Sequence, residues 1–169
     1  MATSEKESRE LSFFAQEKGK RKSRKSVYFD RTEMPEIIIQ GISGMIDVPE
    51  KVRANVDLDR YFDNQIRVQP LLSDQDNNGF SVGCYWFEPN FVMPRHKHDS
   101  DQVVLVVEGE MRQGSKVLKP GAGYFTPAGT PYGFSVGPAG CRIIEFRDRT
   151  NFETVYVDDD PGKWDRPGY

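Results

Sequence analysis

Both histidines of this chain, His96 and His98, lie two residues apart in the stretch PRHKHDSDQVVLVVEGE (residues 94–110). Alternate residues of a β-strand point to the same face, so on a strand the two imidazoles would converge. Pro94 favours extended backbone, and the turn-forming DSD returns the chain to an apolar strand that starts at Gln102. Because imidazole is a common metal ligand, the pattern predicts that the two histidines bind one metal ion.

The elements that must position these side chains are short. From Val27 onward, apolar and polar residues alternate between clusters of Gly, Pro, Asn and Asp, which is typical of strands and tight turns. Helix is expected at residues 4–17 and 56–64. Strands are expected at residues 36–42, 66–72, 80–88, 102–109, 123–128, 131–136, 141–147 and 154–157. So many short strands in one domain indicate an all-β sandwich or barrel.

The run VVLVV (residues 103–107) does not alternate, which predicts a strand that is covered on both faces. Either the segment 30–60 packs over its outer face or a second subunit does. The second alternative predicts a homodimer.

Length and composition indicate one globular domain of 169 residues. No apolar run approaches the roughly 20 residues that span a bilayer, and the N-terminus lacks an apolar signal segment, so a soluble, cytoplasmic protein without membrane partners is expected. Cys84 and Cys141 have no metal-site spacing and are expected to be buried thiols in a reducing compartment.

Charge is unevenly distributed along the chain. Residues 1–26 have a net charge of +4 and the rest a net charge of −7. The stretch KGKRKSRKS (residues 18–26) could attract phosphates, but no aromatic residues accompany it, so a solvated arm is favoured and nucleic-acid binding is not expected. We therefore divide the chain into a disordered basic arm (1–29), a barrel (30–158) and a C-terminal tail (159–169).

Two segments resemble the sequence motifs of the cupin superfamily. The first cupin motif has a glycine, five residues, His-x-His, three residues, a glutamate, six residues and a glycine, and PRHKHDSDQVVLVVEG is similar to it. The second has a glycine, five residues, Pro-x-Gly, two residues, a histidine, three residues and an asparagine, and GAGYFTPAGTPYGFSV (residues 121–136) is similar to it. The resemblance implies the cupin double-stranded β-helix, an all-β jelly-roll barrel, here with a short N-terminal extension.

The chain departs from the motifs at four positions. Asn90 replaces the first glycine, which is tolerated because asparagine also adopts the left-handed backbone, and Val136 replaces the final asparagine. Gln102 replaces the glutamate, and Tyr132 replaces the second-motif histidine. Carried over position by position, the resemblance implies a metal-ligand set of His96, His98, Gln102 and Tyr132.

Two imidazoles and an amide bring no charge, so this set would bind a divalent metal weakly unless Tyr132 ligates as a phenolate. A bound cation can ionise a tyrosine, whose ordinary pKa is about 10. Iron is favoured as the single divalent metal, with zinc, manganese, nickel and copper left open. The alternative is a metal-free barrel in which Gln102 and Tyr132 hydrogen-bond a ligand.

Four further side chains are expected to line the barrel and bind a small-molecule substrate: Tyr85, Arg112, Glu145 and Arg147. Glu145 and Arg147 share strand parity and could clamp the substrate, or they could form an exposed ion pair. A two-histidine site with a weak third ligand leaves coordination positions open, which favours an oxygen-dependent dioxygenase acting on a small aromatic or dicarbonyl compound. The alternatives are a redox-neutral cyclase, lyase or isomerase with Tyr132 as general acid or base, and a metal-free binding protein.

Overall fold

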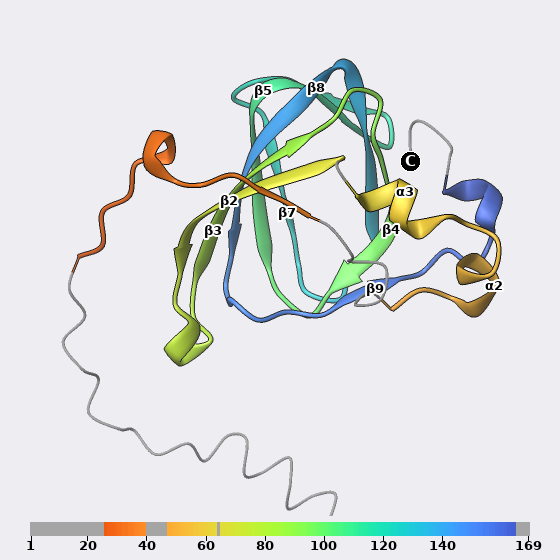
Figure 1. Ribbon diagram of the computed structural model, residues 1–169, viewed down its shortest axis with the longest axis horizontal. Helices are drawn as coiled ribbons and strands as arrows, with labels where there is room; N and C mark the ends of the chain where they lie inside the picture. Colours follow the sequence, from red (N-terminus) through yellow and green to blue (C-terminus); the bar gives the residue numbers. More distant parts are fainter. Residues whose placement is uncertain (1–25, 40–46, 64, 165–169) are drawn as a thin grey trace, which may run out of the picture.

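The computed structural model describes residues 26–39, 47–63 and 65–164 (Figure 1). The helix expected at residues 4–17 lies outside these residues, as does nearly all of the basic stretch 18–26. Within the described ranges, no helix has the length and apolar character that a membrane crossing would require.

The described elements are mostly strands, joined by short helices and turns. In chain order they are η1 (Arg31–Glu33), β1 (Ile37–Ile38), α2 (Glu50–Arg53), α3 (Leu58–Phe62), β2 (Ile66–Ser73), η3 (Gln75–Asn77), β3 (Ser81–Phe87), β4 (Val92–His98), β5 (Gln102–Gln113), β6 (Lys116–Leu118), β7 (Gly123–Thr126), β8 (Tyr132–Arg147), β9 (Thr154–Tyr156) and η4 (Pro161–Lys163). The expected helix at residues 56–64 is therefore confirmed over the five residues of α3.

The strands form one curled antiparallel sheet. Its main path runs β1-β2-β3-β8-β4-β9, and β5 pairs with β6, β7 and β8. Because β8 pairs with β3, β4 and β5, it joins the two halves of the sheet, and Figure 1 shows it bending over one end of the barrel. The all-β jelly-roll barrel that the sequence predicted is confirmed.

Strand β8 corrects one expectation. The sequence predicted separate strands at residues 131–136 and 141–147, but the structure has one strand that continues through Gly137 and Gly140. The register against β5 shifts here, because Met111 pairs with Val136 whereas Gly109 pairs with Cys141. The glycine-rich stretch is thus a bulge that bends the strand without ending it.

Two motif positions have a left-handed backbone, which the sequence had implied for Asn90. Asn90 has a φ of 62° and Gly109 a φ of 74°. A Cβ atom at Gly109 would also collide with the carbonyl of Gly140 on β8. Asparagine therefore serves at the first position, whereas the second position needs glycine for both conformation and space.

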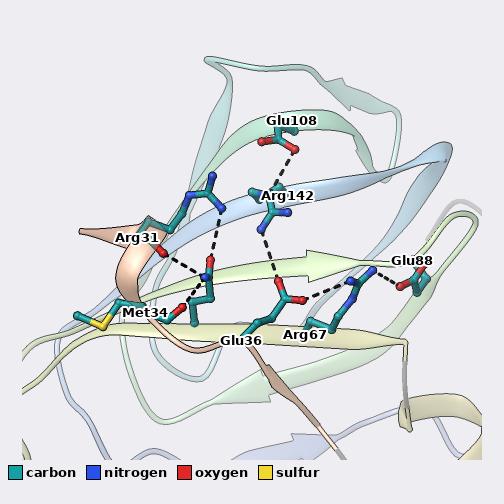
Figure 2. Close-up of polar contacts among 8 residues, drawn as sticks. Arg31, Met34, Glu36, Arg67, Glu88, Glu108 and Arg142 are labelled. Atoms are coloured by element: carbon teal, nitrogen blue, oxygen red, sulfur yellow. Dashed lines mark hydrogen bonds and ion pairs between the residues drawn. The ribbon is translucent and has the colours of Figure 1, made fainter. Parts of the chain in front are cut away.

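The N-terminal segment packs on the outer face of the sheet through Gln69 of β2. The Gln69 amide nitrogen donates to the carbonyls of Arg31 (3.2 Å) and Met34 (2.9 Å), and its oxygen accepts from the Arg31 guanidinium (3.4 Å). These contacts are drawn in Figure 2. Met34 also packs against a small apolar cluster formed by Leu71, Val82 and Cys84.

An ionic network continues along the same face (Figure 2). Glu36 lies 3.3 Å from Nη1 of Arg67 and 4.0 Å from Nη1 of Arg142, and Arg142 reaches Glu108 at 3.3 Å. Trp86 lies between the two arginines, whose guanidinium carbons are 5.8 Å and 5.2 Å from its ring centroid. The segment before β2 is therefore attached by polar and ionic contacts as well as by apolar packing.

The barrel interior is apolar and aromatic, and the C-terminal segment contributes to it. Trp164, which follows η4, has no exposed surface and packs against Tyr61, Phe62 and Tyr156. Helices α2 and α3 and the segment around η4 gather on one side of the barrel in Figure 1. Trp164 therefore anchors the segment that follows β9 to the barrel.

Coverage of the outer face of β5 is incomplete in this chain. Val104 and Val106 point inward and are fully buried, whereas Val103 is 45% exposed and its β7 neighbour Phe125 is 59% exposed. The N-terminal segment thus covers β2 and β3 but leaves the start of β5 open. Pairing with a second copy at this face stays a prediction.

Candidate active site

The two histidines point into the barrel, as their spacing predicted. Along β4, buried residues alternate with half-buried ones, so that His96 and His98 face inward while Arg95 and Lys97 face outward. His96 pairs with Tyr132 of β8 and Tyr156 of β9, which places the histidines between two strands. The imidazole centroids lie 4.8 Å apart, and the Tyr132 ring lies 4.3 Å from His96.

Backbone carbonyls fix the tautomer of both rings. His96 Nδ1 lies 2.7 Å from the carbonyl of Pro94, and His98 Nδ1 lies 2.9 Å from the carbonyl of Glu153. A carbonyl oxygen can only accept, so each Nδ1 carries the hydrogen and each Nε2 keeps its lone pair. In metal-binding histidines, a hydrogen bond from Nδ1 to a carbonyl holds the ring so that Nε2 faces the metal.

Both imidazoles are uncharged at neutral pH. Burial, with a smaller contribution from the nearby Arg147 guanidinium, lowers the pKa of His96 to about 4. Burial also lowers the pKa of His98 to about 3, with contributions from Arg147 and His96. Two neutral ring nitrogens are therefore available as ligands without loss of a proton.

Gln102 is the clearest unsatisfied polar group in the interior. Its side chain is 2% exposed, and neither the amide oxygen nor the amide nitrogen has a hydrogen-bond partner among the described residues. An unpaired buried amide costs about 1 to 3 kcal/mol. A cost of this size, in the position that the motif assigns to a metal ligand, indicates that the amide has a partner in the working protein.

Tyr132 is a buried, protonated phenol. Burial raises the pKa of its hydroxyl well above the ordinary value, and Glu145 raises it further, while Arg147 acts in the opposite direction. The phenolate that would add a negative charge to the ligand set is therefore disfavoured in the chain alone. Tyr132 is better placed as a hydrogen-bond donor.

Beside these side chains lies a cavity of about 170 Å³. Its wall contains both histidines, Tyr132, Tyr85, Glu145 and Arg147; the remaining lining residues are Ile39, Phe62, Ile66, Phe87, Met93, Phe134, Ile143, Phe152, Thr154 and Tyr156. Gln102 is buried next to Tyr132 and does not line the cavity. The wall is thus mostly apolar, with a few polar groups gathered near the histidines.

Arg112 does not belong to this site, contrary to the sequence prediction. Its side chain is 53% exposed and lies 3.8 Å from Glu110, in a surface ion pair. The register shifts in β5 between Val106 and Met111 reverse the strand parity, so that Met111 is buried and Arg112 faces outward.

Glu145 and Arg147 form a buried ion pair in the cavity wall. Arg147 Nε donates to Glu145 Oε1 at 2.8 Å, and Arg147 Nη1 donates to the Ser100 hydroxyl at 2.9 Å. The guanidinium carbon lies 3.9 Å from the centroid of the Phe152 ring. Sequence reasoning missed Ser100 and Phe152, because a turn serine and a loop phenylalanine give no local signal of this role.

The donor set of this site is unusual because it has no charged member. Within residues 26–39, 47–63 and 65–164, no group of three His, Cys, Asp or Glu side chains is placed to hold a metal ion. Two anchored neutral imidazoles and one unpaired amide oxygen nevertheless fit a divalent metal that completes its coordination with water or substrate. The single carboxylate in the wall, Glu145, is instead held by Arg147.

Comparison with known proteins places this architecture in a known fold. No protein-family model matches the sequence, and no curated protein matches it. Solved structures do match. The polyketide cyclase RemF from Streptomyces resistomycificus is 22% identical with a TM-score of 0.54, over 82% of this chain and 89% of that one.

An RmlC-like cupin protein from Ralstonia eutropha is 16% identical with a TM-score of 0.60, over 81% of this chain and 75% of that one. A sugar phosphate isomerase of the cupin superfamily from Silicibacter pomeroyi is 22% identical with a TM-score of 0.54, over 78% of this chain and 82% of that one. Such identities establish the fold and leave the reaction open. This chain therefore has the cupin fold, as its two motifs implied.

Proposed function

We propose that this protein is a metal-dependent cupin enzyme. It performs redox-neutral chemistry on a small aromatic or dicarbonyl compound, as a cyclase, lyase or isomerase. The observation that supports it best is the position of the only carboxylate in the described cavity wall. Glu145 is paired with Arg147 and is not grouped with His96 and His98. It is therefore suited to proton transfer, whereas the described residues do not form the two-histidine, one-carboxylate ligand set of many iron oxygenases.

The residues of the chain suit a reaction that moves a proton next to a carbonyl. Glu145 accepts a proton from a carbon or hydroxyl of the substrate, and Arg147 keeps its carboxylate in place. Burial and Glu145 raise the pKa of Tyr132, which favours the protonated phenol, and its hydroxyl can then donate to the oxygen on which negative charge develops. Tyr85, whose pKa is raised by burial and by Glu145, is a second neutral donor in the same wall.

His96, His98 and Gln102 would hold the metal, which as a Lewis acid would polarise a carbonyl oxygen. Uncharged ligands suit this role, because they leave the full charge of the cation available. The aromatic wall excludes water and packs against a flat substrate. The fold similarity to a polyketide cyclase agrees with carbonyl chemistry of this kind.

Metal content is the first test. The full chain, purified without chelators, should contain about one divalent metal ion per chain by mass spectrometry. The double variant His96→Ala, His98→Ala should contain none. Lys97→Ala is the matched control, because Lys97 lies between the histidines and faces outward. If the wild-type chain stays empty when supplied with iron, manganese, nickel, copper and zinc in turn, a metal-free binding protein is the better conclusion.

Mass balance is the second test and addresses the dioxygenase alternative. Open coordination positions beside an aromatic cavity favour that alternative. The metal-loaded chain is incubated with a panel of aryl 1,3-diketones, under nitrogen and under air. Our proposal predicts products with the mass of the substrate, or of the substrate less water, at equal rates in both gases. Products that gain two oxygen atoms, with matching oxygen consumption, would establish the dioxygenase.

A further inference from the structure

The ion pair in the cavity wall bears on which ligands the cavity accepts. The sequence suggested that Glu145 and Arg147 clamp a substrate together. The structure shows them bonded to each other at 2.8 Å, with side chains only 10% and 5% exposed. Arg147 is also the only lysine or arginine side chain among the described residues that line the cavity.

Three neighbours fix Arg147 in place. Glu145 neutralises its charge, the hydroxyl of Ser100 accepts from Nη1, and the ring of Phe152 covers its face at 3.9 Å. Ser100 is 1% exposed, so its hydrogen bond is protected from water. Phe152 also contacts His98 edge-on, with ring centroids 5.2 Å apart. Arg147 thus connects the carboxylate to the aromatic residue that packs on the metal-ligand histidine.

This arrangement opposes the entry of an anion. A carboxylate or phosphate ester that approached Arg147 would meet Glu145 at the same guanidinium, and it would lose its hydration in an apolar wall. An uncharged ligand pays neither cost. The cavity of about 170 Å³ is close to the engineered cavity of about 150 Å³ that holds benzene, so one aromatic ring fits.

We propose that the Glu145–Arg147 pair makes this cavity selective for an uncharged, single-ring aromatic group that carries a carbonyl or hydroxyl, and that Arg147 is a positioning residue for Glu145 and Phe152, not an anion clamp. The inference rests on the proposed function for the choice of cavity, and it narrows the substrate class. Sugar phosphates and carboxylic acids are excluded from this part of the site.

Benzamide and benzoate test the proposal, because they have nearly the same shape and differ in charge. Each is titrated into the chelator-treated full chain, with binding followed by calorimetry. Benzamide should bind at least about tenfold more tightly than benzoate, since the anion meets a buried, already neutralised arginine. In Glu145→Gln, Arg147 loses its counter-charge, so benzoate binding should tighten by about tenfold or more while benzamide changes little.

Two variants complete the experiment. Glu110→Gln removes one negative charge on the surface, beside Arg112, and should keep the wild-type preference. Ser100→Ala frees Nη1 of Arg147 without changing the charge of the cavity, and should strengthen benzoate binding in the same direction as Glu145→Gln, by less. Ser100→Ala therefore tests the proposal if Glu145→Gln does not fold.

Wild-type binding of benzoate that equals or exceeds that of benzamide would overturn the proposal. An unchanged preference for benzamide over benzoate in Glu145→Gln would also overturn it, or in Ser100→Ala if Glu145→Gln does not fold. The absence of benzamide binding would overturn it as well. These titrations need neither metal nor turnover. A chain that binds no metal can therefore still prefer benzamide, and a metal-loaded, active chain can still lack this preference. Failure of the proposed function is thus distinguishable from failure of the proposed charge selectivity.

Discussion

Two buried glutamines on opposite faces of one sheet show how differently those faces are built. Gln69, on the outer face, is 8% exposed and makes three hydrogen bonds to the N-terminal segment. Gln102, on the inner face, is 2% exposed and makes none among the described residues. The outer glutamine stabilises the fold, whereas the unpaired inner amide costs stability.

Two arginines of strand β8 show the same contrast between the outer and inner faces of the sheet. Arg142 points outward into the network of Glu36 and Glu108, with distances of 3.3 to 4.0 Å and partners that are partly exposed. Arg147 points inward to the buried carboxylate of Glu145 at 2.8 Å. Exposed pairs are weak and screened by salt, whereas a buried charge that loses its partner is costly. Four predictions test this contrast.

The largest effect is expected for Arg147→Met. It leaves Glu145 buried without a counter-charge and should lower the free energy of unfolding by about 3 to 5 kcal/mol in urea denaturation. Arg142→Met should cost about 1 kcal/mol, because its ion pairs and its contact with Trp86 lie at the surface. Adding Glu145→Gln to Arg147→Met should recover much of the loss. Equal losses for the two arginines would remove the distinction between the faces.

The two tryptophans come next. Trp164 has no exposed surface and contacts three inner aromatic residues, so Trp164→Ala should cost about 3 kcal/mol. Trp86 is half-buried between two outer arginines, so Trp86→Ala should cost about 1 to 2 kcal/mol. Thermal unfolding of both variants checks the order. If Trp86→Ala is the more harmful, the outer network holds the fold together more than its exposure suggests.

The glutamines are predicted to respond in opposite directions. In the chelator-treated chain, Gln102→Leu should raise the free energy of unfolding by about 1 to 2 kcal/mol, since it removes an unpaired buried amide. Gln69→Leu should lower it by about 1 to 3 kcal/mol, because two backbone carbonyls lose their donor. Added metal should stabilise the wild type and stabilise Gln102→Leu less. A destabilised Gln102→Leu would show that the amide is satisfied without a ligand.

The smallest effect is expected for Glu108→Gln in the outer network. Its carboxylate is 55% exposed and pairs with Arg142 at 3.3 Å, so the loss should stay below about 0.5 kcal/mol in low salt. At 1 M salt, where the Debye length is about 3 Å, the loss should disappear. The loss caused by Arg147→Met should be the same in both salts. A salt-dependent Arg147 effect would mean that water reaches the inner pair.

The sequence by itself determined the features that depend on local backbone geometry. Residues two apart on a strand share a face, which placed His96 beside His98 and Glu145 beside Arg147. The left-handed backbone at Asn90 followed from the motif position and the residue type. Alternating strands and turns gave the all-β barrel, and the two motifs gave the cupin fold.

Tertiary structure decided what strand parity could not. Register shifts in β5 turned Arg112 outward, because one extra residue reverses every side chain that follows. The partners of Arg147 come from a turn at Ser100 and a loop at Phe152, which only the closed barrel brings together. That Gln102 has no hydrogen-bond partner among the described residues is likewise visible only after folding, because hydrogen-bond satisfaction depends on every neighbour of a buried group.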